Sequence, residues 1–123
     1  KNLSSKRRRV KMKLEPLVSA LSLTSAVGDI PSCFDGVYAG DFLSRAMSRV
    51  EAGDLWITIM SNVNVIAVAS LTEAAAVVLA EGVALDPEAK AAAEEKGITV
   101  LSSPLSVYEI CGILRAAEIS EKG

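Results

Sequence analysis

A cluster of small polar residues, Ser61, Asn62 and Asn64, interrupts the apolar stretch of residues 53–71. The hydroxyl and amide groups of these side chains can act in one of two ways. They can hold a polar ligand at the start of a helix, where backbone N–H groups point outward. They can also cap that helix and bind nothing. The sequence alone leaves both interpretations open.

Similar groups follow two other apolar runs, at Ala80-Glu81-Gly82 and at Ser102-Ser103-Pro104. If the runs are parallel strands, their carboxyl ends share one edge of a sheet, which is where ligands usually bind in such folds. These donors suit a phosphate or a nucleotide edge, but the rim lacks the lysine or arginine that normally neutralises a polyphosphate. The predicted ligand site consists of Ser61, Asn62, Asn64, Gly82, Ser102 and Ser103. The competing interpretation is that Ser103 or Ser106 only caps the last helix.

Several kinds of catalytic chemistry lack their usual residues in this chain. The 123 residues include no histidine, the commonest general base and metal ligand. Cys33 and Cys111 lie far apart and form no CxxC pair, so we expect two reduced, largely buried thiols in a cytoplasmic protein. No GxxxxGK[ST] motif of a P-loop occurs. We therefore predict no enzyme, no catalytic residue, no metal site and no cofactor.

Charge is concentrated at the amino terminus. Residues 1–11 carry six positive charges and no negative one, which leaves seven basic against fifteen acidic residues in the remainder, a net charge of −8. A basic block can be a nucleic-acid-binding arm. We favour a disordered arm, a tag remnant or a misassigned start, followed by a single domain over residues 12–123. The acidic body has no basic patch with interleaved aromatics, so we expect no nucleic-acid partner.

The first half of the body is irregular. Residues 13–21 have apolar side chains at helical spacing and predict a short opening helix. Glycines and prolines punctuate residues 23–40, which predicts short strands joined by turns. Asp41 is then predicted to cap a helix whose apolar face consists of Phe42, Ala46, Met47 and Val50.

From Asp54 onward the pattern is regular. Residues 55–59, 75–79 and 98–101 are apolar runs that predict buried strands, with Trp56 in the core or, alternatively, anchoring a subunit interface. Helices are predicted over residues 62–71, after Asp86-Pro87, and from the capping box Ser106 to Glu109 as far as about Ala117. This β-α-β-α-β-α order predicts an α/β domain of two or three layers with a mainly parallel sheet. No apolar run reaches the roughly 20 residues of a membrane span, so no membrane partner is expected.

Residues 36–119 resemble the stand-alone DRTGG-domain proteins of anaerobic bacteria. The resemblance rests on the strings GVYAGDFLSRAM, GDLWITIMSNVNVIAVASL, AVVLAEG and DPEAKAAAEEKGITVLSSPLSVYEI. It implies a fold similar to the amino-terminal domain of HPr kinase/phosphorylase, whose phosphotransfer depends on a separate P-loop domain. The residues that name the family fall at Ser61, Asn62, Ala80, Glu81 and Gly82, and only the last glycine is kept.

The resemblance implies a function as well. DRTGG domains are regulatory modules fused to phosphotransacetylases, CBS-domain pairs and inorganic pyrophosphatases. By this resemblance we expect a non-enzymatic regulatory or oligomerisation module, a homodimer that acts through a partner protein, with an adenine nucleotide or a phosphorylated metabolite as ligand. Two alternatives stay open: an enzyme or enzyme fragment of the HPr kinase-like phosphotransferase type, and an assembly scaffold that binds no small molecule.

Overall fold

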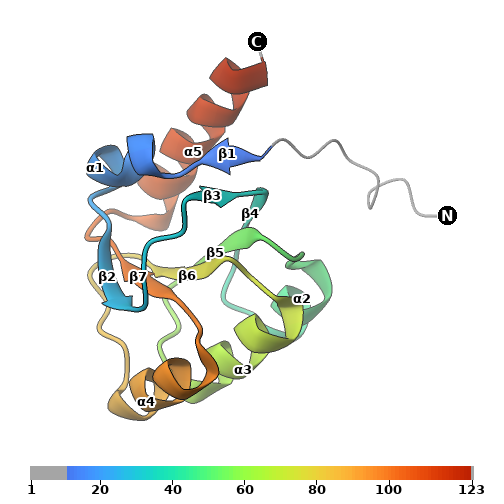
Figure 1. Ribbon diagram of the computed structural model, residues 1–123, viewed down its shortest axis with the longest axis vertical. Helices are drawn as coiled ribbons and strands as arrows, with labels where there is room; N and C mark the ends of the chain where they lie inside the picture. Colours follow the sequence, from blue (N-terminus) through green and yellow to red (C-terminus); the bar gives the residue numbers. More distant parts are fainter. Residues whose placement is uncertain (1–10, 123) are drawn as a thin grey trace, which may run out of the picture.

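The computed structural model describes residues 11–122, the last of these by its backbone alone, and shows an α/β arrangement of three layers (Figure 1). A five-stranded sheet forms the middle layer. Its strands are β2 (Thr24–Val27), β4 (Gly36–Ala39), β5 (Asp54–Thr58), β6 (Ala76–Leu79) and β7 (Val100–Ser102). The helices are η2 (Glu15–Leu17), α1 (Val18–Leu21), α2 (Leu43–Arg49), α3 (Val63–Thr72), α4 (Pro87–Lys96) and α5 (Val107–Lys122). A separate small sheet pairs β1 (Met12–Lys13) with β3 (Cys33–Phe34).

The strand order in the main sheet is β2-β7-β6-β5-β4. The ladders β4–β5, β5–β6 and β6–β7 are parallel, and only β2 runs antiparallel to its neighbour β7. The three predicted strands therefore lie side by side and parallel, as the unbroken apolar runs indicated. The carboxyl ends of β4, β5, β6 and β7 meet at one edge of the sheet, which we call the carboxyl edge.

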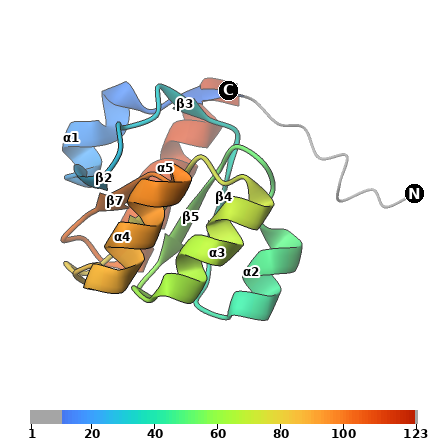
Figure 2. The same cartoon turned by 60° about the horizontal axis from the view of Figure 1, so that its bottom comes forward.

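Helices α2, α3 and α4 cover one face of the sheet, and Figure 2 shows them side by side in front of it. Their buried side chains, such as Ala46, Ile66 and Ala93, pack against Trp56 and Val77 of the strands. Small alanines on α4 let this helix approach the sheet closely. The indole of Trp56 is fully buried here, and its Nε1–H donates to the carbonyl of Gly40 at 3.0 Å. Trp56 is thus a core residue and not a surface anchor.

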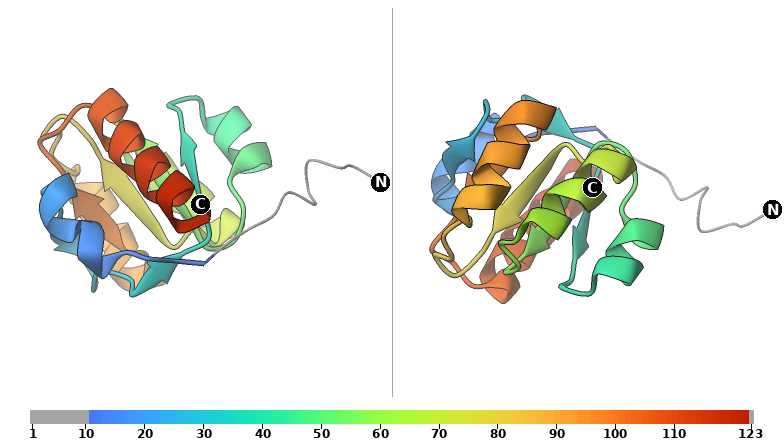
Figure 3. Two further views of the ribbon diagram at one scale, coloured as in Figure 1. Left: turned by 90° about the horizontal axis from the view of Figure 1, so that it is seen from above. Right: turned by 90° about the horizontal axis from the view of Figure 1, so that it is seen from below.

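The opposite face is covered by α5 and by the segment from β1 to α1, which lie side by side over the sheet in the left view of Figure 3. Ile110 and Leu114 of α5 pack against Leu55 and Ile57 of β5. Five further buried residues come from the amino-terminal part of the chain: Met12, Leu14, Leu21, Leu23 and Phe34.

The predicted helix ends are largely confirmed by the geometry. Asn62 is the N-cap of α3, and Asp86 precedes Pro87 at the start of α4. Gly97 ends α4 in the left-handed conformation at φ +70°. The Ser106–Glu109 capping box is formed in both directions, with N–H to side-chain oxygen distances of 3.0 and 3.1 Å. These helix ends could be predicted because they depend on residues only a few positions apart. Asp86 stands at the N-cap position of α4, but its side chain accepts from Ser61 and makes no capping hydrogen bond.

Other predictions were wrong or too coarse. Asp41 does not cap α2, whose N-cap residue is Phe42. Phe42 and Met47 are 69 % and 51 % exposed, because the short α2 turns Ala46, its C-cap residue Val50 and the partly buried Leu43 toward the core. The opening helix is a 3-10 turn followed by the single turn α1, since Pro16 occupies its start. The last helix does not end near Ala117 but continues to Lys122.

The proposed arm of residues 1–11 lies outside the described residues, except for Lys11. The Lys11 ammonium is 3.2 Å from a carboxylate oxygen of Asp35. Among residues 11–122, no helix is both long enough and apolar enough to cross a membrane.

Candidate functional site

The structure brings the predicted site residues to the carboxyl edge. Ser61 and Asn62 follow β5, Gly82 belongs to the turn after β6, and Ser102 and Ser103 stand at the end of β7. Because β5, β6 and β7 are successive neighbours in the sheet, the three loops lie next to one another. The positions at which the resemblance placed the family motif, 61–62 and 80–82, are therefore on adjacent strands.

The side chains after β5 bond mainly to their own surroundings. The Oδ1 atom of Asn62 accepts from the backbone N–H of Asn64 at 2.9 Å, which is the capping interaction of α3. The Ser61 hydroxyl donates to Oδ1 of Asp86 at 2.9 Å, and the Asp86 N–H donates to the Ser61 carbonyl at 3.1 Å. This reciprocal pair ties the start of α3 to the start of α4.

Ser103 is the most buried member of the set, at 1 % exposure. Its hydroxyl donates to the carbonyl of Leu21 at 2.7 Å and accepts from the N–H of Leu105 at 3.1 Å. The hydroxyl therefore joins α1 to the loop before α5. Ser102 is half-buried within β7, opposite Leu79 and Thr24.

The turn after β6 has an unusual backbone. Glu81 and Gly82 both have positive φ, +60° and +68°, a conformation that glycine adopts at little cost and glutamate does not. The N–H of Glu81 donates to the Leu105 carbonyl at 2.8 Å, and the N–H of Gly82 donates to the Ser103 carbonyl at 2.9 Å. The resemblance places the glycines of the family motif at these two positions, and a left-handed backbone favours glycine there.

Sequence reasoning missed a second polar network at the same edge. The Asp41 carboxylate accepts from the Thr58 hydroxyl at 2.7 Å and from the Ile59 N–H at 3.1 Å. The Thr58 hydroxyl in turn accepts from the N–H of Met60 at 3.2 Å. Asp41 thus joins the end of β4 to the end of β5. The signal in the sequence was a threonine at the end of a fully apolar strand, where a hydroxyl needs a partner.

The charges at this edge are negative. The loops 40–42, 59–62, 80–86 and 102–106 contain Asp41, Glu81 and Asp86 but no lysine or arginine. A polyphosphate placed here would meet carboxylates without a compensating cation. Neutral groups, such as the Asn62 amide and backbone N–H groups, are the donors that remain suited to a ligand.

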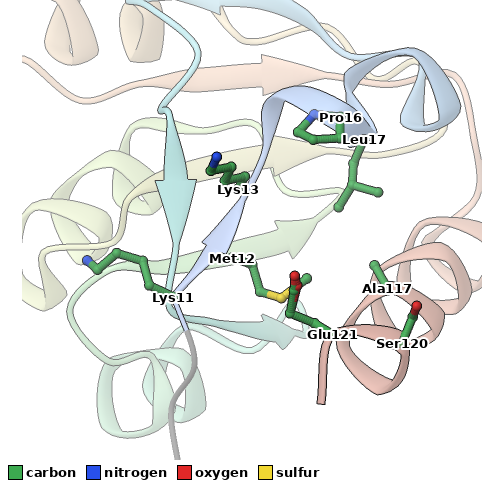
Figure 4. Close-up of a pocket in the computed structure, with 8 residues that line it drawn as sticks. All are labelled: Lys11, Met12, Lys13, Pro16, Leu17, Ala117, Ser120 and Glu121. Atoms are coloured by element: carbon green, nitrogen blue, oxygen red, sulfur yellow. The ribbon is translucent and has the colours of Figure 1, made fainter. Parts of the chain in front are cut away.

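A cavity of about 520 Å³ lies away from the carboxyl edge, between β1 and the end of α5. In Figure 4 the side chains of Met12 and Leu17 face Ala117 and Ser120 of α5. A smaller groove of about 250 Å³ runs between β4 and α5 beside Cys111. Partial burial raises the pKa of the Cys111 thiol, which keeps it protonated at neutral pH.

Comparisons with known proteins agree with this arrangement. A search of curated proteins finds no match. One solved structure, of the CBS and DRTGG domains of the regulatory region of Clostridium perfringens pyrophosphatase complexed with the activator diadenosine tetraphosphate, superposes with a TM-score of 0.70 at 16 % identity. The match covers 86 % of this chain but only 47 % of that one, and at this identity it shows the fold.

The sequence profile of the DRTGG domain matches residues 35–117, from the start of β4 into α5. That range includes the loops that hold residues 61–62 and 80–82, and it includes helices α2, α3 and α4. The chain therefore belongs to the DRTGG domain family.

Proposed function

We propose that this chain is a non-enzymatic regulatory module that binds an adenine nucleotide, forms a homodimer and acts on a partner protein in the cytoplasm. Residues 12–123 form its one DRTGG domain in this proposal, and residues 1–11 are a separate arm. The observation that supports it is the family membership. The likeness to a pyrophosphatase regulatory region complexed with a diadenosine activator supports the choice of ligand class.

We place the ligand at the carboxyl edge, against Ser61, Asn62, Asn64, Gly82, Ser102 and Ser103. The charges of this edge favour recognition of the adenine base and ribose, because the Asp86 carboxylate next to Ser61 repels phosphate groups. The Asn62 side chain uses its oxygen in capping, which leaves its NH₂ group as a donor toward a base edge.

The same hydrogen bonds support a non-catalytic role. The carboxylates of Asp41 and Asp86 each accept a hydrogen bond from a hydroxyl group at this edge. These bonds hold neighbouring loops together. Within residues 11–121, every buried side-chain nitrogen or oxygen has a hydrogen-bond partner. This arrangement positions loops and is consistent with a module whose loops respond to a ligand.

Isothermal titration calorimetry tests the ligand proposal, with adenosine, AMP, ATP, diadenosine tetraphosphate and inorganic phosphate as separate probes. We expect adenosine compounds to bind and phosphate alone not to bind. The variant Asn62→Asp keeps a good cap but removes the amide donor and adds a negative charge. It should weaken binding by about tenfold, the scale of one hydrogen bond to a buried or charged group.

The matched control is Ser44→Asp, which adds the same charge at an exposed position of α2 and should leave binding unchanged. Absence of heat with every adenosine compound at millimolar concentration would overturn the ligand proposal. Incubation with ATP tests the non-enzymatic part. Turnover that disappears in Asp41→Asn would show that the edge is catalytic.

A further inference from the structure

Strand β4 ends the main sheet, and its outer side pairs with no strand among residues 11–122. The N–H of Gly40 donates to the Ile57 carbonyl at 3.1 Å, and Ala39 lies opposite Ile57 in the ladder. In a parallel ladder, alternate residues bond to the same neighbour. The N–H and C=O groups of Val37 and Ala39 therefore point away from β5, toward the outside of the sheet.

This edge is short, at four residues, but it lacks the charge, proline and bulge that commonly prevent edge pairing. Its residues, Gly36–Ala39, include no charge and no proline, and their register with β5 is continuous. The other edge strand, β2, is different. Its register with β7 shifts between Ser25 and Val27, and its first two residues are polar and exposed.

A groove accompanies the free edge of β4. Helix α5 packs against β4 and leaves a space of about 250 Å³ beside it. The side chains that line the groove are Val37, Ala39, Cys111, Leu114, Arg115 and Glu118. Its floor is apolar, and its only charged residues are an arginine and a glutamate one helical turn apart.

The two charges form a self-complementary pair. The Arg115 guanidinium and the Glu118 carboxylate form an ion pair on α5, with 3.1 Å between nitrogen and oxygen. The two residues are three positions apart in the sequence and carry opposite charges. A two-fold axis reverses the direction of a helix, so a second α5 placed alongside would bring its glutamate toward Arg115 and its arginine toward Glu118. A two-fold interface requires this kind of surface, in which residue i contacts residue j and j contacts i.

We propose that the β4 edge and its groove are the homodimer interface, where β4 pairs antiparallel with β4 of a second copy. The outward backbone groups of Val37 and Ala39 bond across the axis, their side chains fill the groove, and Arg115 meets Glu118 of the partner subunit. The five-stranded sheets of the two copies join into one. This inference rests on the homodimer of the proposed function and names its contact surface.

The apolar stretch of residues 53–71 fits a dimer interface less well. Its large exposed side chains are Ile59, at 39 %, and Leu71, at 71 %. Ile59 precedes α3 at the carboxyl edge, and Leu71 lies in the last turn of this ten-residue helix. They are separated by the length of the helix and form no continuous patch.

Light scattering of the full chain across a dilution series tests the interface. We expect a mass of twice 12.9 kDa at micromolar concentration. Ala39→Lys places an ammonium group in the groove of each copy and should raise the dissociation constant by about tenfold or more, since like charges would meet across the axis. Thr24→Lys makes a matched change on exposed β2 and should leave the dimer intact.

A charge exchange on α5 gives an independent test. Arg115→Glu gives each copy two acidic residues in the groove, and Glu118→Arg gives each copy two basic ones. Each variant alone should be monomeric where the unchanged chain is dimeric. A mixture of the two variants should form a heterodimer, because every contact across the axis then joins opposite charges. Circular dichroism of each variant checks that the fold is retained.

The outcomes separate this interface from the broader proposal. A chain that is monomeric at every concentration overturns both the interface and the homodimer. A dimer that survives Ala39→Lys and both charge variants overturns this interface but keeps the homodimer. Adenosine binding, measured by calorimetry, stands apart from either result.

Discussion

Three helices cover one face of the sheet, and one long helix with an amino-terminal segment covers the other. On the first face, α2, α3 and α4 sit side by side over buried residues such as Trp56, Val77 and Leu79. On the second, α5 shares the surface with β1, α1 and the small β1–β3 sheet, and the 520 Å³ cavity and the 250 Å³ groove open there. A further hollow of about 440 Å³ lies on the first face, between α4 and the end of β2. Repeating β-α units cover the first face, which we call the closed face. The second face, which we call the open face, is covered by segments that lie far apart in the sequence.

The residues that match the DRTGG family include nearly all of the closed face but only part of the open face. The match begins at residue 35, so the helices of the closed face all lie within it. Of the buried side chains on that face within residues 11–121, only Val27 precedes residue 35. The open face, in contrast, takes Met12, Leu14, Leu21, Leu23 and Phe34 from outside the matched range. The segment before the matched range is therefore part of the core.

The strongest test of that conclusion is a chain that starts at residue 35. It loses the edge strand β2 and six buried apolar side chains, those five and Val27. Each contributes about 1.5–3 kcal/mol, against a total stability of about 5–15 kcal/mol. We expect no cooperative thermal transition by circular dichroism. A sharp transition within a few degrees of that of the full chain would show that the open face is dispensable.

A matched pair of core substitutions compares the two faces directly. Trp56→Ala removes a buried aromatic side chain from the closed face, and Phe34→Ala removes one from the open face. Both residues are at most 1 % exposed. Each should lower the free energy of unfolding by about 3–5 kcal/mol in urea titrations. A loss below about 1 kcal/mol for Phe34→Ala alone would mean that the open face is loosely packed.

The closed face could be predicted from the sequence because its determinants are local. Apolar runs and Asp86-Pro87 are signals within a few residues, and each one is confirmed. The Ser106–Glu109 box, which starts α5 on the open face, is equally local and is confirmed as well. The bonds that shape the carboxyl edge are not local. Asp41 meets Thr58 across 17 positions, and Ser103 meets Leu21 across 82.

For the candidate site too, the sequence predicted the local features but not the contacts between distant residues. The sequence placed its residues after three strands, and parallel pairing brought those loops together. It left open whether Asn62 capped a helix, and the structure shows that it does. Asp41 was assigned to a cap because the nearest helix was the only partner visible in the sequence. Its actual partner became adjacent only through the β4–β5 pairing.

Ser103→Ala removes the hydroxyl that joins α1 to the loop before α5. The buried Leu21 carbonyl loses its donor and the Leu105 N–H loses its acceptor. Leaving such groups unsatisfied costs about 1–3 kcal/mol, which we expect to see as a lower urea midpoint with an unchanged slope. The neighbouring Ser102→Ala should change stability by less than about 0.5 kcal/mol. Equal effects at the two serines would remove the special role of the Ser103 hydroxyl.

Substitutions in the turn after β6 should change stability less than Ser103→Ala does, and the direction of each change can be predicted. Glu81→Gly should raise stability by about 0.5–1 kcal/mol, because it removes a side chain from a left-handed backbone position. Gly82→Ala should lower it by a similar amount through φ alone, since an added Cβ meets no atom within 4 Å. Differential scanning calorimetry can resolve both shifts. Opposite signs from those expected would show that the turn has another conformation in solution.

The smallest effect is expected from deletion of residues 1–11, which sharpens the boundary of the open face. Met12 is 6 % exposed, whereas the Lys11 side chain is 66 % exposed and pairs with Asp35 at the surface. An exposed ion pair contributes about 0–1 kcal/mol, so the melting temperature should fall by only a few degrees, as it should in Lys11→Ala. A fall beyond roughly 8 °C for the deletion, without one for Lys11→Ala, corresponds to more than 1 kcal/mol and would mean that the basic segment docks on the domain. The core of the open face would then begin before Met12.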